Sequence, residues 1–410
     1  MSNDTQPEIR FPGFTEDWEL RKLGEILVLL KDGTHGTHKD VDEGMYLLSA
    51  KNIKNGKINI DESDRIISED EYKSIHKNFN LEKGDVLLTI VGSIGEAAVL
   101  ENPFKLTFQR SVAYLRPNGT LTSQFLYTTI MSTKFQRELK KRQVVSAQPG
   151  IYLGDLSMIP IELPCMEEQQ KIGTFFKQLD DTITLHQRKL DLLKETKKGF
   201  LQKMFPKNGA KVPEIRFPGF TGDWEQRKVF EISKVTYGGG TPKTNTKEFW
   251  NGNIPWIQSS DLEINRLFNV SPKKKITSEA VKKSAAKIIP PNSIAIVTRV
   301  GVGKLALMPF EYATSQDFLS LSELQIDSYF GIFSLYSMLQ KELKNIQGTS
   351  IKGMTKSDLL EKKVTIPKKY EEQQKIGAFF KQLDDTIALH QHELDLLKET
   401  KKGFLQKMFV

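Results

Sequence analysis

Residues 167–181 read EEQQKIGTFFKQLDD, and residues 371–385 read EEQQKIGAFFKQLDD. The identity continues to Phe205 in the first copy and to Phe409 in the second, with four differences over 39 aligned positions. The differences are Thr174/Ala378, Thr184/Ala388, Arg188/His392 and Lys189/Glu393. A repeat of this length has to be explained before single residues are interpreted, because it sets the architecture of the whole chain.

A shorter repeat lies ahead of each long one. Residues 7–19 read PEIRFPGFTEDWE, and residues 213–225 read PEIRFPGFTGDWE. Aromatic residues around Pro-Gly are typical of a rigid turn with apolar anchors. We expect this tag to cap the end of a neighbouring helix, to form a docking site for a partner, or to do both. The chain therefore contains the same series of parts twice: a tag, a variable block and a helix.

The long repeat has the apolar spacing of a coiled coil. Its apolar positions alternate in steps of four and three, interrupted only by His186 and Lys197 in the first copy and by His390 and Lys401 in the second. The predicted seam residues are Ile172, Phe176, Leu179, Ile183, Leu190, Leu193 and Phe200, and Ile376, Phe380, Leu383, Ile387, Leu394, Leu397 and Phe404. A lone helix of about 35 residues, roughly 50 Å long, would expose this whole stripe. We therefore expect the two copies to pair antiparallel; the alternative is two separate core helices in unrelated domains.

The two variable blocks differ in sequence but follow one plan. Residues 83–100, KGDVLLTIVGSIGEAAVL, parallel residues 291–308, PNSIAIVTRVGVGKLALM, as a strand, a glycine-containing hairpin and a second strand. Residues 108–115, FQRSVAYL, likewise parallel residues 315–322, SQDFLSLS. Each block is therefore predicted to be a small α+β domain with long polar loops.

Charge and composition narrow the class of protein. The net charge is +8, which permits nucleic-acid binding without requiring it. Residues 20–160 carry 19 Lys/Arg against 17 Asp/Glu, whereas residues 226–366 carry 20 against 12, so the excess lies in the second block. A single cysteine, Cys165, no long apolar run and no signal-like N-terminus favour a cytoplasmic protein without a membrane span.

Enzyme signatures were tested and none fits. Residues 298–304, TRVGVGK, lack the first glycine of a phosphate-binding loop. His35 and His38 have no nearby cysteine or carboxylate set of the kind that binds zinc, so no metal site is expected. The G-x-S-x-G motif of hydrolases is absent. We therefore expect no catalytic residue and no cofactor in this chain.

Four features together resemble one known family. They are the two RFPGFTxDWE tags, GGGTPKTNTKEFWNGNIPWIQSSDL at 238–262, QGTSIKGMTKSDLLEKKVTIP at 347–367, and the two EEQQKIGxFFKQLDD helices. In this combination the chain resembles the specificity (S) subunit of type I restriction–modification systems over almost its whole length.

The resemblance implies a non-catalytic, DNA-binding subunit that contributes to defence against foreign DNA. Each target-recognition domain would read one half of a bipartite site in double-stranded DNA, and the helices would dock two modification subunits. Those partners would methylate adenine N6 from S-adenosylmethionine, and two restriction subunits would use ATP and Mg²⁺ to translocate and cleave. Competing interpretations are a coiled-coil scaffold that bridges two proteins without touching DNA, and an autonomous nuclease or methyltransferase.

The predicted architecture is α+β, with two similar target-recognition domains separated by a pair of long antiparallel α-helices. The predicted parts are residues 1–160 for the tag and first domain, 161–206 for the first spacer helix, 207–366 for the linker, second tag and second domain, and 367–410 for the second spacer helix.

Candidate DNA contacts are polar and basic residues on loops, since Arg, Lys, Asn and Gln read bases and Lys, Ser and Thr hold phosphates. In the first block they are His35, Thr37, His38, Lys39, Lys51, Arg110, Gln143 and Gln148. In the second they are Thr241, Lys243, Thr244, Lys247, Arg299, Lys304, Gln316, Lys352 and Lys356. Arg299 and Lys304 bracket a predicted hairpin turn, and Arg299 is predicted to read a base; uniform weakening on its removal would indicate a phosphate contact instead.

Overall fold

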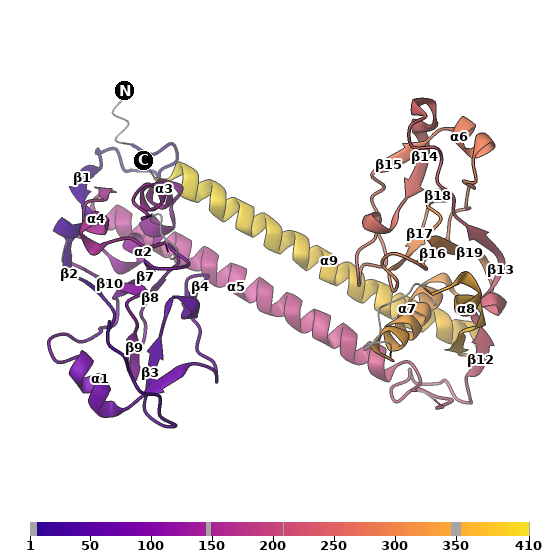
Figure 1. The fold of residues 1–410 in the computed structure, drawn as a ribbon, viewed down its shortest axis with the longest axis horizontal. Helices are drawn as coiled ribbons and strands as arrows, with labels where there is room; N and C mark the ends of the chain where they lie inside the picture. The colour runs from indigo at the N-terminus through magenta and orange to yellow at the C-terminus, as the bar shows by residue number, and fades with distance from the viewer. Residues whose placement is uncertain (1–5, 145–148, 208, 346–353, 410) are drawn as a thin grey trace. The chain divides into compact units, whose positions relative to one another are not determined.

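A computed structural model describes residues 6–144, 149–207, 209–345 and 354–409. The chain forms two compact units: Met1–Gln187 joins His392–Val410 in the first, and Arg188–Gln391 forms the second. Two long helices, α5 (Met166–Lys203) and α9 (Tyr370–Lys407), contribute one end to each unit. Each unit therefore contains one strand-rich domain together with the start of one repeated helix and the end of the other (Figure 1).

The first domain is built on two sheets. The larger has the order β2 (Leu27–Asp32), β10 (Val112–Pro117), β7 (Val86–Thr89) and β8 (Ala97–Val99), all antiparallel. The smaller has the order β6 (Arg65–Ile67), β3 (Met45–Leu48) and β9 (Leu106–Phe108), with β3 and β9 parallel. Short ladders join β1 (Glu19–Lys22) to β11 (Pro160–Leu163) and β4 (Ile53–Lys54) to β5 (Lys57–Ile58). The helices are α1 (Glu69–Ile75), α2 (Ser123–Met131), α3 (Thr133–Lys141) and α4 (Leu153–Ser157), and the 3₁₀ turns are Leu23–Ile26 and Ala50–Asn52.

The second domain repeats this plan. Its larger sheet has the order β13 (Ser233–Gly238), β19 (Phe318–Leu324), β16 (Ser293–Val297) and β17 (Leu305–Met308). Its smaller sheet has the order β15 (Lys274–Ile276), β14 (Trp250–Ile257) and β18 (Ala313–Thr314), and β12 (Glu225–Lys228) pairs with β20 (Lys363–Ile366). The helices are α6 (Ser278–Lys283), α7 (Ser328–Asn345) and α8 (Lys356–Glu361), and the 3₁₀ turns are Val229–Ile232, Lys247–Phe249 and Ser259–Asp261. The strand order of each larger sheet therefore matches, as the parallel sequence plans predict.

One local difference separates the domains. A single 18-residue helix, α7, stands where the first domain has α2 and α3. At the break, the extended backbone of Ser132 ends α2, and its hydroxyl accepts a hydrogen bond from the Phe135 amide and caps α3. Thr122 and Asp327 accept from the Phe125 and Phe330 amides at the starts of α2 and α7, so the equivalent of Ser132 is Ser337, and α7 continues through it. The serine alone therefore does not explain the break.

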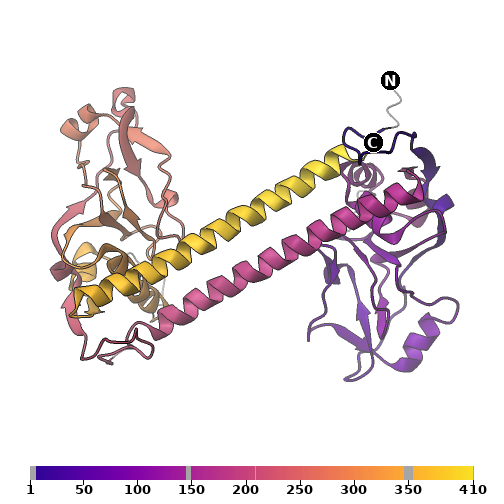
Figure 2. The ribbon, with the colours of Figure 1, turned by 180° about the vertical axis from the view of Figure 1, so that it is seen from behind.

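Within each unit the two long helices run antiparallel (Figure 2). In the first unit, the ring centroids of Phe175 on α5 and Phe404 on α9 lie 5.1 Å apart, edge to face. In the second unit, Phe379 and Phe200 repeat the contact at 5.2 Å with the helices exchanged. The predicted antiparallel pairing is confirmed, and it replaces the alternative of separate core helices.

The predicted seam faces inward. Six of its residues are buried, namely Ile172, Phe176, Leu190, Ile376, Phe380 and Leu394, and the remaining eight are half-buried. The lysines that interrupt the heptad pattern are explained by ion pairs between the helices: Lys197 bonds Asp384 at 2.5 Å, and Lys401 bonds Asp180 at 2.5 Å. Each lysine break in one helix is therefore neutralised by an aspartate of the other. Among the described residues, no helix combines the length and apolar character that crossing a membrane requires.

The tag ties the end of one long helix to the start of the other. In the first unit, Arg10 donates two hydrogen bonds to Glu168 of α5 at 2.7 and 2.8 Å, and the Ile9 amide donates to the last carbonyl of α9, that of Lys407, at 3.0 Å. Phe11 packs edge-to-face on Phe175. In the second unit the same contacts join Arg216 to Glu372, Ile215 to Lys203 and Phe217 to Phe379. The tag thus caps a helix end, as its sequence predicts.

Removing the arginine of a tag should destabilise its unit strongly. Glu168 and Glu372 side chains are 0% and 1% exposed, so Arg10→Ala or Arg216→Ala would leave a buried carboxylate without its partner, a change that costs about 3–5 kcal/mol. Arg21→Ala is the matched control, because Arg21 pairs with Glu19 on the surface and such pairs contribute less than about 1 kcal/mol. Urea unfolding of the full chain should show an earlier transition for the first two variants only; equal midpoints for all three would contradict the role of the tag.

Candidate nucleic-acid interface

A tight glycine contact holds the loop that follows the first strand of each large sheet. In the first domain, a Cβ on Gly33 would overlap the carbonyl oxygens of Phe108 and Gln109. In the second, a Cβ on Gly239 would overlap the carbonyl oxygen of Ser315. Only glycine fits either position, so both loops are pinned against the strand segment that precedes β10 or β19.

Matching hydrogen bonds define which residues of the two domains are equivalent. The Thr34 amide donates to the Phe108 carbonyl at 2.9 Å, and the Gly240 amide donates to the Thr314 carbonyl at 2.8 Å. Gln109 and Ser315 likewise donate to the last residue of β3 and of β14. Phe108 is therefore equivalent to Thr314. The sequence comparison had aligned Phe108 with Ser315, so the structure corrects that alignment by one residue. The sequence comparison aligned Gln109 with Gln316, whereas the backbone hydrogen bonds make Arg110 the equivalent of Gln316.

In the first domain the candidate residues cluster on the loop after β2. His35 is exposed, and its ring bonds Asp32 at 2.6 Å, while the His38 ring bonds the Thr34 hydroxyl at 2.8 Å. Arg110 is exposed beside them, since its amide donates to the Thr34 carbonyl at 3.0 Å. Thr37 and Lys39 are also exposed on this loop, Gln143 is half-buried elsewhere in the domain, and Gln148 lies outside the described residues.

Lys51 has a structural partner. Its amine bonds Asp64 at 2.7 Å, and the Asp64 side chain is 1% exposed. Burial opposes ionisation of Asp64, but hydrogen bonds from Asn52 and Lys51 outweigh burial and hold the pKa of its carboxyl below the usual value. The Asp61 amide adds a third hydrogen bond at 2.8 Å. This pair could not be predicted from the sequence, because a loop separates its two partners.

In the second domain most candidates lie on exposed loops. Thr241, Lys243, Thr244 and Lys247 follow the glycines after β13 and are exposed, as is Gln316. Lys304 is half-buried and donates its amine to the Ser259 carbonyl at 3.1 Å, so it holds the hairpin to the neighbouring turn. Lys352 lies outside the described residues.

Arg299 and Lys356 come together with a third cation that the sequence analysis missed. Burial lowers the pKa of Lys356, and repulsion from Arg299 and Lys287 lowers it further, whereas Asp317 opposes the shift. Lys287 could have been noticed as the last lysine of a basic segment, residues 273–287, but nothing in the sequence connects that segment to Lys356.

Comparison with known proteins places these two domains. A sequence model described as the type I restriction modification DNA specificity domain matches residues 15–195 and again residues 221–399. The chain belongs to this family of specificity subunits. The predicted resemblance is therefore confirmed, and each match covers the last five residues of one tag, one domain and most of one long helix.

Individual relatives agree with this assignment. The chain is 25% identical over 409 residues to the MjaX type I restriction enzyme specificity subunit of Methanocaldococcus jannaschii, covering 95% of this chain and 92% of the relative. It is 49% identical over 82 residues to the EcoR124I/EcoR124II specificity subunit of Escherichia coli, 20% of each chain. Its fold is similar to the crystal structure of a type I restriction-modification S subunit from M. genitalium, with a TM-score of 0.66, 15% identity and coverage of 99% of both chains.

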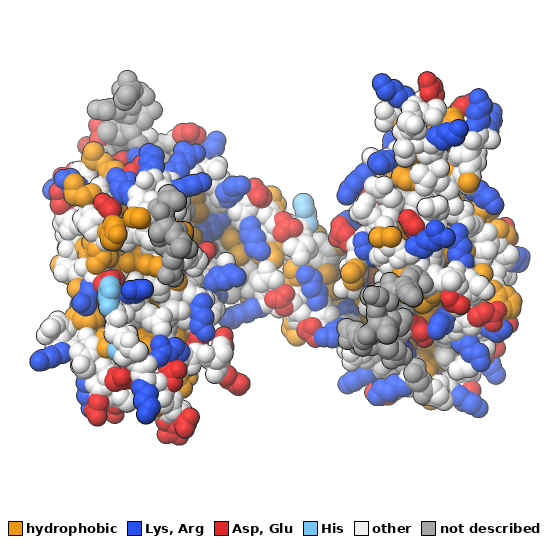
Figure 3. All heavy atoms as spheres, in the orientation of Figure 1, with side chains coloured by type: hydrophobic (Ala, Val, Ile, Leu, Met, Phe, Trp, Pro, Cys, Tyr) orange, Lys and Arg blue, Asp and Glu red, His pale blue; other side chains and the backbone are white. Residues whose placement is uncertain are grey.

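The two specificity domains differ in charge. Lys and Arg side chains gather over β14, β15 and α6 of the second domain, whereas acidic side chains lie among basic ones over α1 and β3 of the first (Figure 3). Lys274 also stacks on the rings of Trp250 and Trp256, with its amine 5.6 and 5.8 Å from their centroids. The second domain therefore offers a polyanion more attraction than the first.

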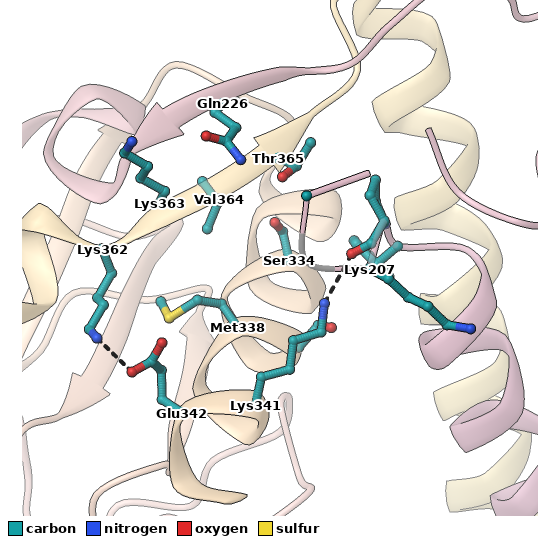
Figure 4. Close-up of a pocket in the computed structure, with 14 residues that line it drawn as sticks. Lys207, Gln226, Ser334, Met338, Lys341, Glu342, Lys362, Lys363, Val364 and Thr365 are labelled. Atoms are coloured by element: carbon teal, nitrogen blue, oxygen red, sulfur yellow. Dashed lines mark hydrogen bonds and ion pairs between the residues drawn. The ribbon is translucent and has the colours of Figure 1, made fainter. Parts of the chain in front are cut away.

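The second unit also has an open cavity of about 330 Å³ between β20, α7 and the linker that follows α5 (Figure 4). Two of the lysines that line it are engaged: Lys341 donates to the Pro206 carbonyl at 3.0 Å, and Lys362 bonds Glu342 at 2.5 Å. Burial lowers the pKa of Lys341, which weakens its attraction for an anion. The cavity therefore lies at the joint between the linker and the domain.

Asp64→Asn should remove part of the acid sensitivity of the first domain. A carboxyl whose folded pKa is depressed stabilises the protein above its unfolded pKa of about 3.9, and this contribution is lost as the pH falls through the lower folded value. The variant should be less stable than wild type at pH 7, and the difference should shrink towards pH 3. Asp70→Asn, at an exposed position on α1, is the control. Urea midpoints measured from pH 7 to pH 3 test this; a difference that stays constant with pH would contradict it.

Proposed function

We propose that this chain is the DNA-reading subunit of a type I restriction–modification complex, with each domain reading one half of a bipartite site in double-stranded DNA. The observation that carries the proposal is that both domains hold the same pair of loops on the same backbone hydrogen bonds, yet present different side chains. Because the loops have equivalent backbones, they can approach a groove of the duplex in the same way in both domains. Their different side chains would then select different bases.

The side chains at equivalent positions differ in their chemistry. Where the first domain presents His35 and Arg110, the second presents Thr241 and Gln316, and all four are exposed. Arginine pairs with two acceptors of guanine, and glutamine pairs with the donor and acceptor of adenine. The two half-sites should therefore be unlike. The remaining candidates on these loops, among them Thr37, Lys39, Lys243 and Lys247, supply further base and phosphate contacts.

The repeated helices support docking of two identical partners. Leu185 and Leu389 are 65% and 56% exposed, and Leu192 and Leu396 are 68% and 60% exposed, although each pair is identical between the copies. Packing within the helix pair does not require identity at outward positions. A partner that binds the same surface twice does. We assign this surface to two modification subunits.

Catalysis and cofactors belong to the partners in this proposal. Two modification subunits bring S-adenosylmethionine and methylate adenine, and two restriction subunits bring ATP and Mg²⁺ for translocation and cleavage. The chain itself contributes recognition and no chemical step, and the complex works in the cytoplasm, where the DNA is.

Base reading is tested by selection from a random duplex pool, using the chain assembled with its methyltransferase partner. The wild type should enrich one motif with two unlike halves. Arg110→Ala should relax one position of one half, because losing a two-point contact to guanine costs about 1–3 kcal/mol of discrimination. Gln316→Ala should relax the other half only.

Arg21→Ala, a surface arginine paired with Glu19, serves as the control and should enrich the wild-type motif. Absence of any enrichment by the wild type would remove DNA recognition and leave a protein scaffold. Uniform weakening by Arg110→Ala across all sequences would make that residue a phosphate contact.

Docking is tested by the mass of the complex with the modification subunit. Leu185→Asp with Leu192→Asp should remove one partner, the equivalent pair of changes at Leu389 and Leu396 should remove the other, and all four changes should remove both. Leu20→Asp is the control, because Leu20 is also exposed but its equivalent in the repeat is Gln226. Two partners bound to the fourfold variant would exclude these surfaces as docking sites.

A further inference from the structure

Three successive glycines in the second domain form a point where separate segments meet. A Cβ on Gly238 would lie 2.7 Å from the amine of Lys356 at the start of α8. A Cβ on Gly239 would overlap the carbonyl of Ser315, and one on Gly240 would overlap the backbone of Ala285. At Gly239 and Gly240 the close atoms are backbone, so only glycine allows the segment before β19 and the segment after α6 to approach this loop. At Gly238 the close atom is the flexible end of Lys356, which can move aside.

This convergence places three cations around the loop. Lys356 lies directly on Gly238, and Lys287 is two residues beyond the Ala285 that packs on Gly240. Arg299 comes from the hairpin between β16 and β17, which is joined to the same region because the Thr298 amide donates to the Asp317 carbonyl at 2.7 Å. Burial is the main cause of the lowered pKa of Lys356, and repulsion from Arg299 and Lys287 lowers it further.

Little in the protein offsets this positive charge. In the described part of the chain, no carboxylate forms an ion pair with Lys356, Arg299 or Lys287, although other lysines of the domain, such as Lys228 with Glu361, are paired. Asp317 raises the pKa of Lys356, but its effect is smaller than that of either cation, and its carboxylate also accepts a hydrogen bond from the Ser315 hydroxyl at 3.3 Å. A cluster of unpaired cations held together by tight backbone contacts is stabilised when an anion binds.

The first domain does not have this cluster. The strand registers of the two larger sheets make Asp32 of the first domain the equivalent of Gly238 in the second. Asp32 accepts a hydrogen bond from His35. In the hairpin, Val91 of the first domain is equivalent to Arg299 of the second. Leu153 is the first residue of α4, as Lys356 is of α8. One acidic and two apolar residues therefore replace the glycine and two of the cations.

We propose that Lys356, Arg299 and Lys287, gathered around Gly238–Gly240, form an anion site that binds a backbone phosphate of the duplex, and that only the second domain has one. The proposal rests on the proposed function, because it assigns the phosphate to DNA. It also reassigns Arg299, which the sequence favoured as a base reader: a guanidinium that shares its surroundings with two ammonium groups contacts phosphate and so gives affinity without sequence preference.

The test measures how affinity of the full chain for a random-sequence duplex changes with salt. Each lost phosphate contact should reduce the slope of log K against log salt concentration by about 0.9, because fewer counterions are released on binding. Lys356→Ala, Arg299→Ala and Gly238→Asp should each show this loss, the last by giving the second domain the carboxylate of the first. In selection experiments Arg299→Ala should enrich the wild-type motif.

Lys228→Ala is the matched control, since it removes one positive charge that Glu361 already neutralises, and its slope should equal that of the wild type. Arg299 and Lys287 are exposed, so Arg299→Ala and Lys287→Ala should fold and should test the site even if Lys356→Ala does not fold. Wild-type slopes for all the folded variants would overturn the anion site alone. No salt-dependent binding by the wild type would instead overturn the proposed DNA-reading function.

Discussion

The structure depends on the packing of each long helix against the opposite end of the other. Phenylalanine rings meet edge to face at the contact, and lysine–aspartate pairs fill the places where the apolar pattern is interrupted. Neither helix could remain extended alone, because its apolar stripe would face water. The pairing also brings the end of α9 beside the start of α5, so the first unit needs residues from both ends of the chain.

The tags make this pairing part of each domain. A buried arginine–glutamate pair and one backbone hydrogen bond join the tag to both helices, and the cores then continue from the sheets into the helix pair. In the first core Ile172 and Phe176 of α5 share a cluster with Met408, which directly follows α9. In the second, Ile376 and Phe380 of α9 share a cluster with Met204, which directly follows α5. Because the same tag and helix contacts recur in both units, the loops of the two domains can differ in sequence without changing this packing.

The arrangement of the tags and the paired helices could be predicted from the sequence because both parts occur twice in the chain. Identity across the repeated helices indicates shared contacts, and the heptad spacing indicates which face is buried. The loops were harder, since their contacts join segments far apart in the chain. The Lys51–Asp64 pair and the approach of Ala285, two residues before Lys287, to Gly240 are contacts of this kind, and neither could be predicted from the sequence. The one-residue register error between Phe108 and Ser315 arose because short apolar strands align almost equally well in two registers.

The central claim is that two domains with one backbone plan read two unlike half-sites. Its most direct test replaces residues 226–366 with a second copy of residues 20–160, leaving both tags and both helices in place. Methylation mapping of DNA in cells that hold this chain and its modification partner would then read out the recognised motif. The account predicts that the motif changes to two copies of the half-site read by the first domain. Retention of the original two unlike halves would contradict it.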